Sequence, residues 1–265
     1  MTTETQSGMM FKLDQQENLS ASEQNVIVAD IGNSRIKLYD GDTFVSFKNG
    51  YNIDLNILNY ISNRTQSYVV YSSVNNIAKN TFLQILKRIG CGFEDVEQKL
   101  ARFSPIDFSD VPGMGNDRKL GLISALSIVD PPLITVDFGT CITVNLVDKN
   151  LKCLGGMIMP GFNTQARSLV HYTSSLPQVR IDFQLNPIGN DTVSAINAGI
   201  QNITFKGLDA HVKSLMSSQF AGEKVNVVMT GGISGILSQF TFSFDYYIDK
   251  HLVIEGIWSL ASKNG

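Results

Sequence analysis

The sequence predicts an α/β fold made of two similar halves. Two short apolar runs, residues 26–29 and 133–136, have the composition of buried strands, and each leads into an aspartate with a glycine two positions later. The aspartates, Asp30 and Asp137, stand about one small domain apart, which is typical of a duplicated domain rather than of a solenoid repeat. Segments with helical spacing alternate with strands in both halves, and this order favours α/β architecture.

The first half, residues 25–130, opens with a predicted hairpin and continues with helices. Residues 1–24 carry no sustained period, so we expect a disordered N-terminal leader. Gly90 and Pro131 follow the two helical segments as stop signals. The expected elements are strands over 26–29 and 35–39, a closing turn at 40–42, and helices over 78–89 and 117–129.

The second half, residues 131–265, repeats the hairpin. The expected elements are strands over 133–136, 141–147 and 225–229, and helices over 191–215 and 255–263. We expect the longer helix to be interrupted near Gly207, because glycine is a poor helix former. The last strand runs into Thr230, Gly231 and Gly232, a glycine turn that would suit the adenosine side of a nucleotide.

The composition excludes several classes of protein. There are 21 Lys and Arg against 24 Asp and Glu, so the formal charge is −3 and a broadly basic nucleic-acid surface is excluded. No run approaches the roughly 18 apolar residues of a membrane helix, and the N-terminus lacks a secretory signal pattern. Cys91, Cys141 and Cys153 form no Cys-x-x-Cys pair and are interpreted as small core residues. We therefore expect a soluble cytoplasmic protein without membrane or nucleic-acid partners.

The two strand-end acids, Asp30 and Asp137, are the first candidates for chemistry. In open α/β sheets, ligands bind beyond the carboxyl ends of the strands, and turn amides can bind phosphate there. An aspartate about 4 Å from a phosphate would be repelled by roughly 4 kcal/mol, so a cation must stand between them. One Asp-x-Gly is more often a plain turn, but its recurrence in both halves favours a site.

The segment Gly115, Asn116, Asp117, Arg118 places an acid and a base at the start of a predicted helix. The helix dipole favours Asp117 as an anion at this position. Two interpretations stand at this point. Asp117 caps the helix, or it accepts a proton from an alcohol while Arg118 fixes the substrate.

Taken in order, these motifs resemble type III pantothenate kinase, a bacterial enzyme of coenzyme A synthesis in the superfamily of acetate kinase, sugar kinases, Hsp70 and actin. The motifs are DIGNSRIK at 30–37, GNDR at 115–118, DFGT at 137–140, GGMIMPG at 155–161 and TGG at 230–232. The resemblance implies two actin-like, ribonuclease H-like domains with mixed sheets and an active-site cleft between them. It also implies a homodimer that uses ATP to phosphorylate pantothenate to 4′-phosphopantothenate.

The resemblance further implies roles for individual residues. The ATP phosphate-binding hairpin would consist of Asp30, Ile31, Gly32, Asn33, Ser34, Arg35, Ile36 and Lys37, with Asp30 organising Mg²⁺ through water. Asp137 would bind a monovalent cation, K⁺ or NH₄⁺, and Thr140 would contact the nucleotide. The pantothenate site would consist of Phe108, Gly115, Asn116, Arg118, the proton acceptor Asp117, and Thr192 reaching in from the dimer partner.

Departures from the family pattern leave alternatives open. Phe108 stands where the family usually has tyrosine, so a hydroxyl contact to the substrate is missing, and the proline spacing is altered at Pro112. Ser34 replaces the commoner threonine but keeps the hydroxyl. Lys37 is either a phosphate clamp or a residue on a solvated strand face. The alternatives to a pantothenate kinase are another kinase or phosphatase of the superfamily, acting on a sugar or polyphosphate, and a catalytically silent regulatory relative.

Overall fold

The first half contains a five-stranded mixed sheet. The computed structural model describes residues 25–49, 53–64, 67–184 and 186–263, so the predicted leader at 1–24 lies outside the described residues. The strands are β1 (Asn25–Ile31), β2 (Arg35–Tyr39), β3 (Phe44–Lys48), β4 (Ser67–Ser73) and β5 (Gly92–Asp95). They lie in the order β3-β2-β1-β4-β5, with β1 antiparallel to β2 and parallel to β4. The predicted first hairpin is confirmed.

The second half contains a five-stranded sheet of the same design. Its strands are β6 (Leu133–Phe138), β7 (Cys141–Val147), β8 (Cys153–Pro160), β9 (Asn226–Gly231) and β10 (Tyr247–Ile248). They lie in the order β10-β9-β6-β7-β8, with β6 antiparallel to β7 and parallel to β9. Taken from the opposite edge, this order matches that of the first sheet. The predicted α/β fold with two similar halves and mixed sheets is therefore confirmed.

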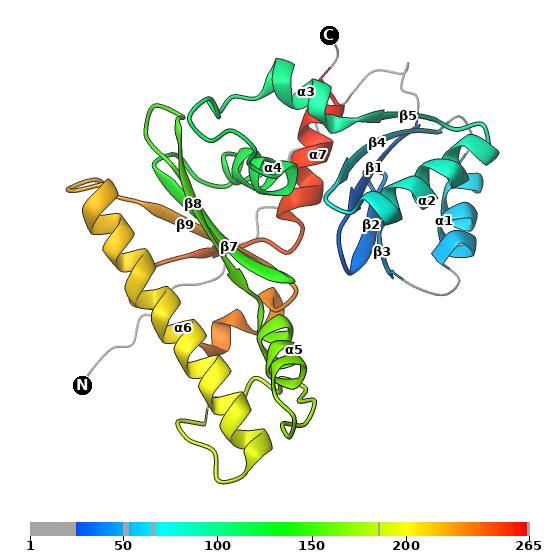
Figure 1. Cartoon of the computed structure of the whole chain (residues 1–265). Helices are drawn as coiled ribbons and strands as arrows, with labels where there is room; N and C mark the ends of the chain where they lie inside the picture. Colours follow the sequence, from blue (N-terminus) through cyan, green and yellow to red (C-terminus); the bar gives the residue numbers. More distant parts are fainter. Residues whose placement is uncertain (1–24, 50–52, 65–66, 185, 264–265) are drawn as a thin grey trace, which may run out of the picture.

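Helices cover the sheets in three layers (Figure 1). The helices are α1 (Ile53–Ser62), α2 (Asn76–Arg88), α3 (Val96–Phe103), α4 (Asn116–Ala125), α5 (Phe162–Tyr172), α6 (Thr192–Gln219) and α7 (Leu252–Ala261), with a 3₁₀ helix η1 (Ser234–Gln239). α1 and α2 pack on the outer face of the first sheet, in a core that we call the first outer core. α5 and α6 pack on the outer face of the second sheet. No helix in these described segments is both long and apolar enough to cross a membrane.

Between the sheets lies a middle layer formed by α4 and α7. Its core joins Val28 of β1 and Leu133 of β6 to helix residues such as Leu120 and Ile257. α7 follows the second sheet in sequence but packs on α4 and on β1 of the first. Side chains alternate along a strand, so Asp30 shares the face of Val28 and points toward this layer. The same argument places Asp137 of β6 on the face of Leu133.

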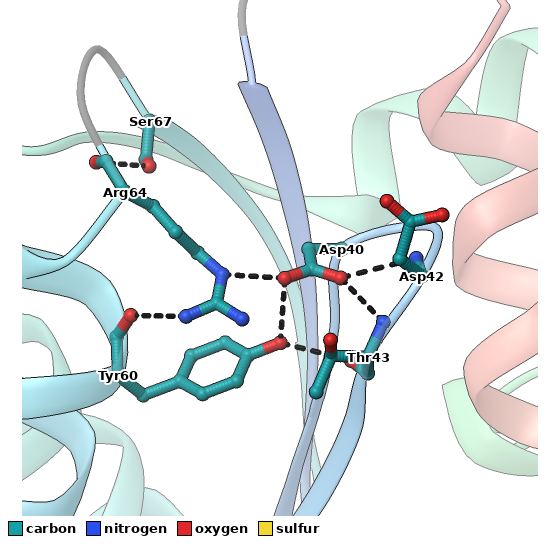
Figure 2. Close-up of polar contacts among 6 residues, drawn as sticks. All are labelled: Asp40, Asp42, Thr43, Tyr60, Arg64 and Ser67. Carbon is teal, nitrogen blue, oxygen red and sulfur yellow. Dashed lines mark hydrogen bonds and ion pairs between the residues drawn. The ribbon is translucent and has the colours of Figure 1, made fainter.

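A polar cluster fixes the turn between β2 and β3 to the end of α1 (Figure 2). The Asp40 carboxylate accepts hydrogen bonds from the Tyr60 hydroxyl at 3.0 Å, the Thr43 N–H at 2.7 Å and the Asp42 N–H at 3.1 Å. It also forms an ion pair with Arg64, whose guanidinium stacks on the Tyr60 ring at 3.6 Å from its centroid. The predicted closing turn at residues 40–42 is confirmed, and this cluster holds it in place.

Several sequence predictions need correction. The helix expected over 117–129 ends at Ala125, and residues 126–128 continue as turns. α6 is not interrupted at Gly207, because buried Phe205 and Leu208 on either side outweigh the roughly 1 kcal/mol that glycine costs in a helix. Cys141 is exposed rather than buried, since it begins β7 directly after a turn. The elements that the sequence analysis did not define are β3, α1, β4, β5, α3, β8, α5, η1 and β10.

Candidate active site

The turns that follow β1 and β6 meet in the structure. Each turn is closed by the N–H of its glycine, Gly32 or Gly139, which donates to a nearby backbone carbonyl at 2.9 and 3.0 Å respectively. The hydroxyls of Ser34 and Thr140, one from each turn, lie 3.0 Å apart. The two motifs predicted to bind the nucleotide are therefore neighbours in space, although they belong to different halves.

Asp30 and Lys37 form a cross-strand ion pair at the end of the first hairpin. They are register partners on β1 and β2, and the Lys37 Nζ lies 3.1 Å from the Asp30 Oδ2. Burial alone would lower the pKa of Lys37, but the charges of Asp30 and Asp137 outweigh it and leave that pKa raised. Lys37 is thus a cation held among carboxylates, which favours the charged-site interpretation over that of a solvated strand face.

Asp137 is a buried carboxylate whose charge is only partly compensated. Its burial, together with the charges of Asp117 and Asp30, raises its pKa to about 6, although Lys37 acts in the opposite direction. Mutual electrostatic effects of this kind require the three acids to lie near one another. The structure therefore places Asp30, Asp117 and Asp137, which come from both halves, within electrostatic range of one another, with Lys37 acting on Asp30 and Asp137.

Gly231 leaves room for the Asp137 side chain. A Cβ atom at position 231 would lie 2.6 Å from Asp137 Oδ1 and 2.5 Å from the Phe138 carbonyl oxygen, closer than real contacts allow. The φ of Gly231 is +106°, a value that other residues rarely adopt. The glycine turn after β9 thus shapes the surroundings of Asp137.

The start of α4 supplies the remaining acid. Gly115 occupies the N-cap position and makes no side-chain cap bond, while Asp117 is the second residue of the helix. The Asp117 Oδ1 accepts the Arg118 N–H at 2.9 Å. Burial and then the charge of Asp30 raise the pKa of Asp117, against the lowering effect of this bond. The structure therefore places Asp117 inside the first turn rather than at the cap.

Arg118 is anchored to the second sheet by a polar chain. The Arg118 Nε donates to Asn145 Oδ1 at 2.6 Å, and the Asn145 Nδ2 donates to Thr135 Oγ1 at 3.3 Å. Asn145 and Thr135 are buried register partners on β7 and β6. The sequence analysis missed both. The available signal was a polar residue in the middle of each of two mostly apolar strands.

Comparison with known proteins identifies the family. Residues 26–214 match the family model described as type III pantothenate kinase. The chain belongs to this family. The resemblance inferred from the motifs is therefore confirmed over most of the sequence.

Curated relatives support the assignment. The chain is 34% identical over 155 residues to the type III pantothenate kinase of Sulfurihydrogenibium sp., covering 58% of this chain and 60% of the relative. It is 35% identical over 147 residues to that of Gloeobacter violaceus, covering 55% and 63%. These alignments span under two thirds of the relatives' length. A longer alignment, 253 residues at 26% identity with the Finegoldia magna enzyme, covers 89% of this chain and 96% of that one.

A solved structure supports the fold. A protein from Campylobacter jejuni described as a Baf family transcriptional activator aligns with a TM-score of 0.58 at 23% identity. The alignment covers 88% of this chain and 96% of that one. At this level of identity, the likeness concerns the fold alone.

Within the family's ATP hairpin, the predicted residues differ in what they offer a ligand. The Ile31 and Ile36 side chains are buried in the first outer core, so only their backbone groups are available. Arg35 is bound to β3, where its Nε donates to the Ser46 hydroxyl at 2.7 Å. Asn33 is exposed in the turn beside Ser34.

Two predicted substrate residues of the family pattern, Phe108 and Thr192, lie in different parts of the molecule. Phe108 packs against the middle layer, with the Lys119 Nζ 5.5 Å from its ring centroid. Thr192 is exposed at the first turn of α6, and Figure 1 shows that turn at the far end of the second half from α4. Within one copy of the chain, Thr192 does not join the site.

The oxygen groups at the two turns suit a hard cation such as Mg²⁺. Carboxylates and hydroxyls are the ligands preferred by hard cations, and Mg²⁺ usually takes one or two protein carboxylates and keeps several waters. In the described part of the chain, no group of three or more His, Cys, Asp or Glu is placed to hold a metal. The residues present therefore fit a metal shared with phosphate and water better than an all-protein cage.

Proposed function

We propose that the chain catalyses ATP-dependent phosphorylation of pantothenate to 4′-phosphopantothenate, the first step of coenzyme A synthesis. The main support is the convergence of Asp30, Asp117 and Asp137, because burial and mutual repulsion together raise the pKa of Asp137 to about 6. Holding several carboxylates close together costs free energy in the chain alone, because like charges repel. Bound cations offset this cost, so such a cluster is typical of a site that binds charged ligands. Family membership supports the identity of that substrate.

In this proposal, the two turns bind the nucleotide. Backbone amides at residues 30–37 and the Ser34 and Thr140 hydroxyls face the phosphates, and Lys37 adds a positive charge. Asp30 would hold Mg²⁺ through water, and Asp137 would bind a monovalent cation, K⁺ or NH₄⁺. Bound Mg²⁺ neutralises charge on the transferred phosphoryl group.

Asp117 acts on the acceptor alcohol. It orients the primary hydroxyl of pantothenate and accepts its proton while that oxygen bonds to the γ-phosphorus and the bond to the ADP oxygen breaks. Arg118 fixes the substrate with its guanidinium donors. Positioning and charge neutralisation supply most of the acceleration in such transfers.

The partner subunit completes the proposed site. We propose that Thr192 enters the pantothenate site of a second copy, which requires a homodimer, because the first turn of α6 lies away from α4, the helix that carries Asp117 (Figure 1). Light scattering on the purified protein tests this arrangement. A monomer that is fully active at every concentration would contradict it. We further propose that the enzyme works in the cytoplasm.

A coupled assay of ADP release tests the function. ADP release should depend on pantothenate, and it should be faster in potassium than in sodium buffer. A panel with sugars and polyphosphate under the same conditions tests the other kinases of the superfamily. ADP release that is indifferent to pantothenate, or phosphorylation of another alcohol in preference to it, would contradict the assignment. Any ATP-dependent phosphorylation excludes the catalytically silent relative.

A further inference from the structure

A chain of hydrogen-bonded polar side chains runs from Arg118 into the second sheet. Asn145 and Thr135 are each 2% exposed, and apolar Leu133 and Val147 on the same strands pack into the middle-layer core beside them. A buried side-chain amide is unfavourable unless its polar groups are satisfied. The Asn145 amide uses both of its ends, one toward Arg118 and the other toward Thr135.

The contact with Arg118 determines the orientation of the Asn145 amide. The arginine Nε carries a hydrogen and can only donate, so the Asn145 oxygen must face it and the NH₂ must face Thr135. The Thr135 hydroxyl accepts that second bond at 3.3 Å. Two neighbouring strands thus hold one acceptor oxygen at a fixed place beneath Arg118.

This contact decides which donors of Arg118 remain for a ligand. The Nε is occupied at 2.6 Å from Asn145 Oδ1, so the two Nη groups at the end of the guanidinium are left. Across the described segments, Arg118 forms no ion pair with a carboxylate within 4.0 Å. Its charge instead lowers the pKa of the neighbouring Asp117. Asn145 therefore fixes the orientation of the guanidinium through its Nε, and the two Nη groups remain as donors for a ligand.

We propose that Asn145 is a positioning residue for substrate binding, acting through Arg118. The acceptor oxygen at position 145 orients the guanidinium so that its Nη donors meet the polar groups of the acceptor substrate. This inference rests on the proposed function for the identity of that substrate. It adds a role for a buried residue on β7, which lies outside every motif by which the family was inferred.

Steady-state kinetics of Asn145→Leu test the role. Leucine keeps the volume but removes the acceptor, so the KM for pantothenate should rise about tenfold, the effect expected from one misdirected charged hydrogen bond. The kcat should change less than threefold and the KM for ATP should stay unchanged. Asn145→Asp keeps an acceptor oxygen toward Arg118 and should restore a KM close to that of wild type.

A mutant cycle separates positioning from general damage. In an Arg118→Ala background, Asn145→Leu should have no further effect on the KM for pantothenate, because the group it orients is gone. Asn226→Leu is the matched control, since it removes an amide on β9 of the same sheet that donates to the Asp130 carbonyl and not to Arg118. That variant should leave both KM values unchanged. Should Asn145→Leu fail to fold, Thr135→Val frees the same amide and should raise the KM about threefold.

A measurement independent of turnover distinguishes this inference from the proposed function. In ¹⁵N-labelled protein, the Arg118 Nε–H should give a shifted, slowly exchanging resonance that is lost in Asn145→Leu and retained in Asn145→Asp. If pantothenate is not a substrate but this resonance behaves as stated, the function fails and the positioning contact stands. A resonance indifferent to Asn145→Leu, or a KM within twofold of wild type in that variant, would overturn the inference.

Discussion

The fold shifts the pKa values of two carboxylates, Asp40 and Asp137, in opposite directions. Burial alone would raise the pKa of Asp40, but hydrogen bonds from Thr43, Arg64, Asp42 and Tyr60 leave it lowered (Figure 2). Asp137, beside Asp30 and Asp117, has its pKa raised to about 6 by burial and by the charges of the other two. The chain therefore satisfies the Asp40 carboxylate and leaves Asp137 and Asp117 under-compensated.

The difference separates a structural charge from one held for a ligand. Asp40 has partners from its own turn and from α1, and these fix the position of the β2–β3 turn. The acids of the middle layer come from β1, β6 and α4. Lys37 is the cation beside Asp30 and Asp137, and Arg118 is the cation beside Asp117. Removing an acid from the first group should affect stability, whereas removing one from the second should affect activity.

The largest expected effect is on activity, from Asp117→Asn. This variant keeps the shape of the side chain but removes the proton acceptor, so kcat for pantothenate should fall by about 10²- to 10⁴-fold. Its thermal midpoint should be equal to or above that of wild type, because burial disfavours the charged form. Turnover and thermal unfolding on the same preparation provide both measurements.

Asp54→Asn provides the control for Asp117→Asn. Asp54 is an exposed acid in the first turn of α1, so this variant makes the same chemical change away from the site. Its kcat should equal that of wild type. Wild-type turnover in Asp117→Asn would remove Asp117 from the mechanism.

The second effect is on stability, from Asp40→Ala. Loss of the carboxylate leaves Arg64 and the Tyr60 hydroxyl without their acceptor and should lower the free energy of unfolding by about 2 kcal/mol. Urea unfolding measures this loss. The KM and kcat should stay unchanged well below the unfolding temperature. A variant as stable as wild type but catalytically impaired would break the distinction between the two groups.

How far the sequence predicts this arrangement depends on the range of each interaction. The Asp-x-Gly hairpins at Asp30 and Asp137 depend on local periodicity and turn residues, and both are confirmed. The continuity of α6 through Gly207 was mispredicted, because propensity is local while Phe205 and Leu208 pack against distant parts of the chain. Tertiary packing outweighed a weak helix former at that position.

Within the site, motifs identified the acids but not their supports. Asp30, Asp117 and Asp137 stand in recognisable segments, and their convergence was expected from the family resemblance. Asn145 was missed, because its partner Arg118 lies 27 residues away in sequence and only the folded middle layer brings them together. The ion pair of Lys37 with Asp30 follows from strand register, which an alternating pattern alone does not determine.

A third, smaller effect tests whether a raised pKa alone marks a ligand site. Burial, followed by the charge and hydrogen bond of Asp249, raises the pKa of Glu255 in α7 to about 7. The raised pKa of Glu255 stabilises the folded state. This contribution is fully present at pH values below about 4.5, the pKa in the unfolded chain, and it is lost as the pH rises through about 7. Glu255→Gln should therefore gain stability over wild type as pH increases.

Urea unfolding at pH 5, 6.5 and 8 measures the Glu255 effect. The stability difference between Glu255→Gln and wild type should be smallest at pH 5 and largest at pH 8. The lowered pKa of Asp40 acts with the opposite sign, since its contribution is present at neutral pH and is lost only as pH falls through that pKa. A difference independent of pH would show that Glu255 titrates normally.

The smallest effect concerns two adjacent serines at the end of β4. Ser72 is the register partner of Asp30 and is 1% exposed, yet its hydroxyl has no hydrogen-bond partner among the described residues. Ser73 donates to the Asn75 carbonyl at 3.1 Å and to that of Ile31 at 3.4 Å. Removing a satisfied hydroxyl should destabilise, whereas removing an unpaired one should not.

Ser73→Ala should therefore lower the free energy of unfolding by about 1 kcal/mol, whereas Ser72→Ala should leave it unchanged or raise it by up to about 1 kcal/mol. Urea unfolding of the two variants side by side measures the difference, and each variant serves as the control for the other. A loss in Ser72→Ala equal to that in Ser73→Ala would mean that the Ser72 hydroxyl is satisfied in solution. The under-compensation beside Asp30 would then be confined to the carboxylates.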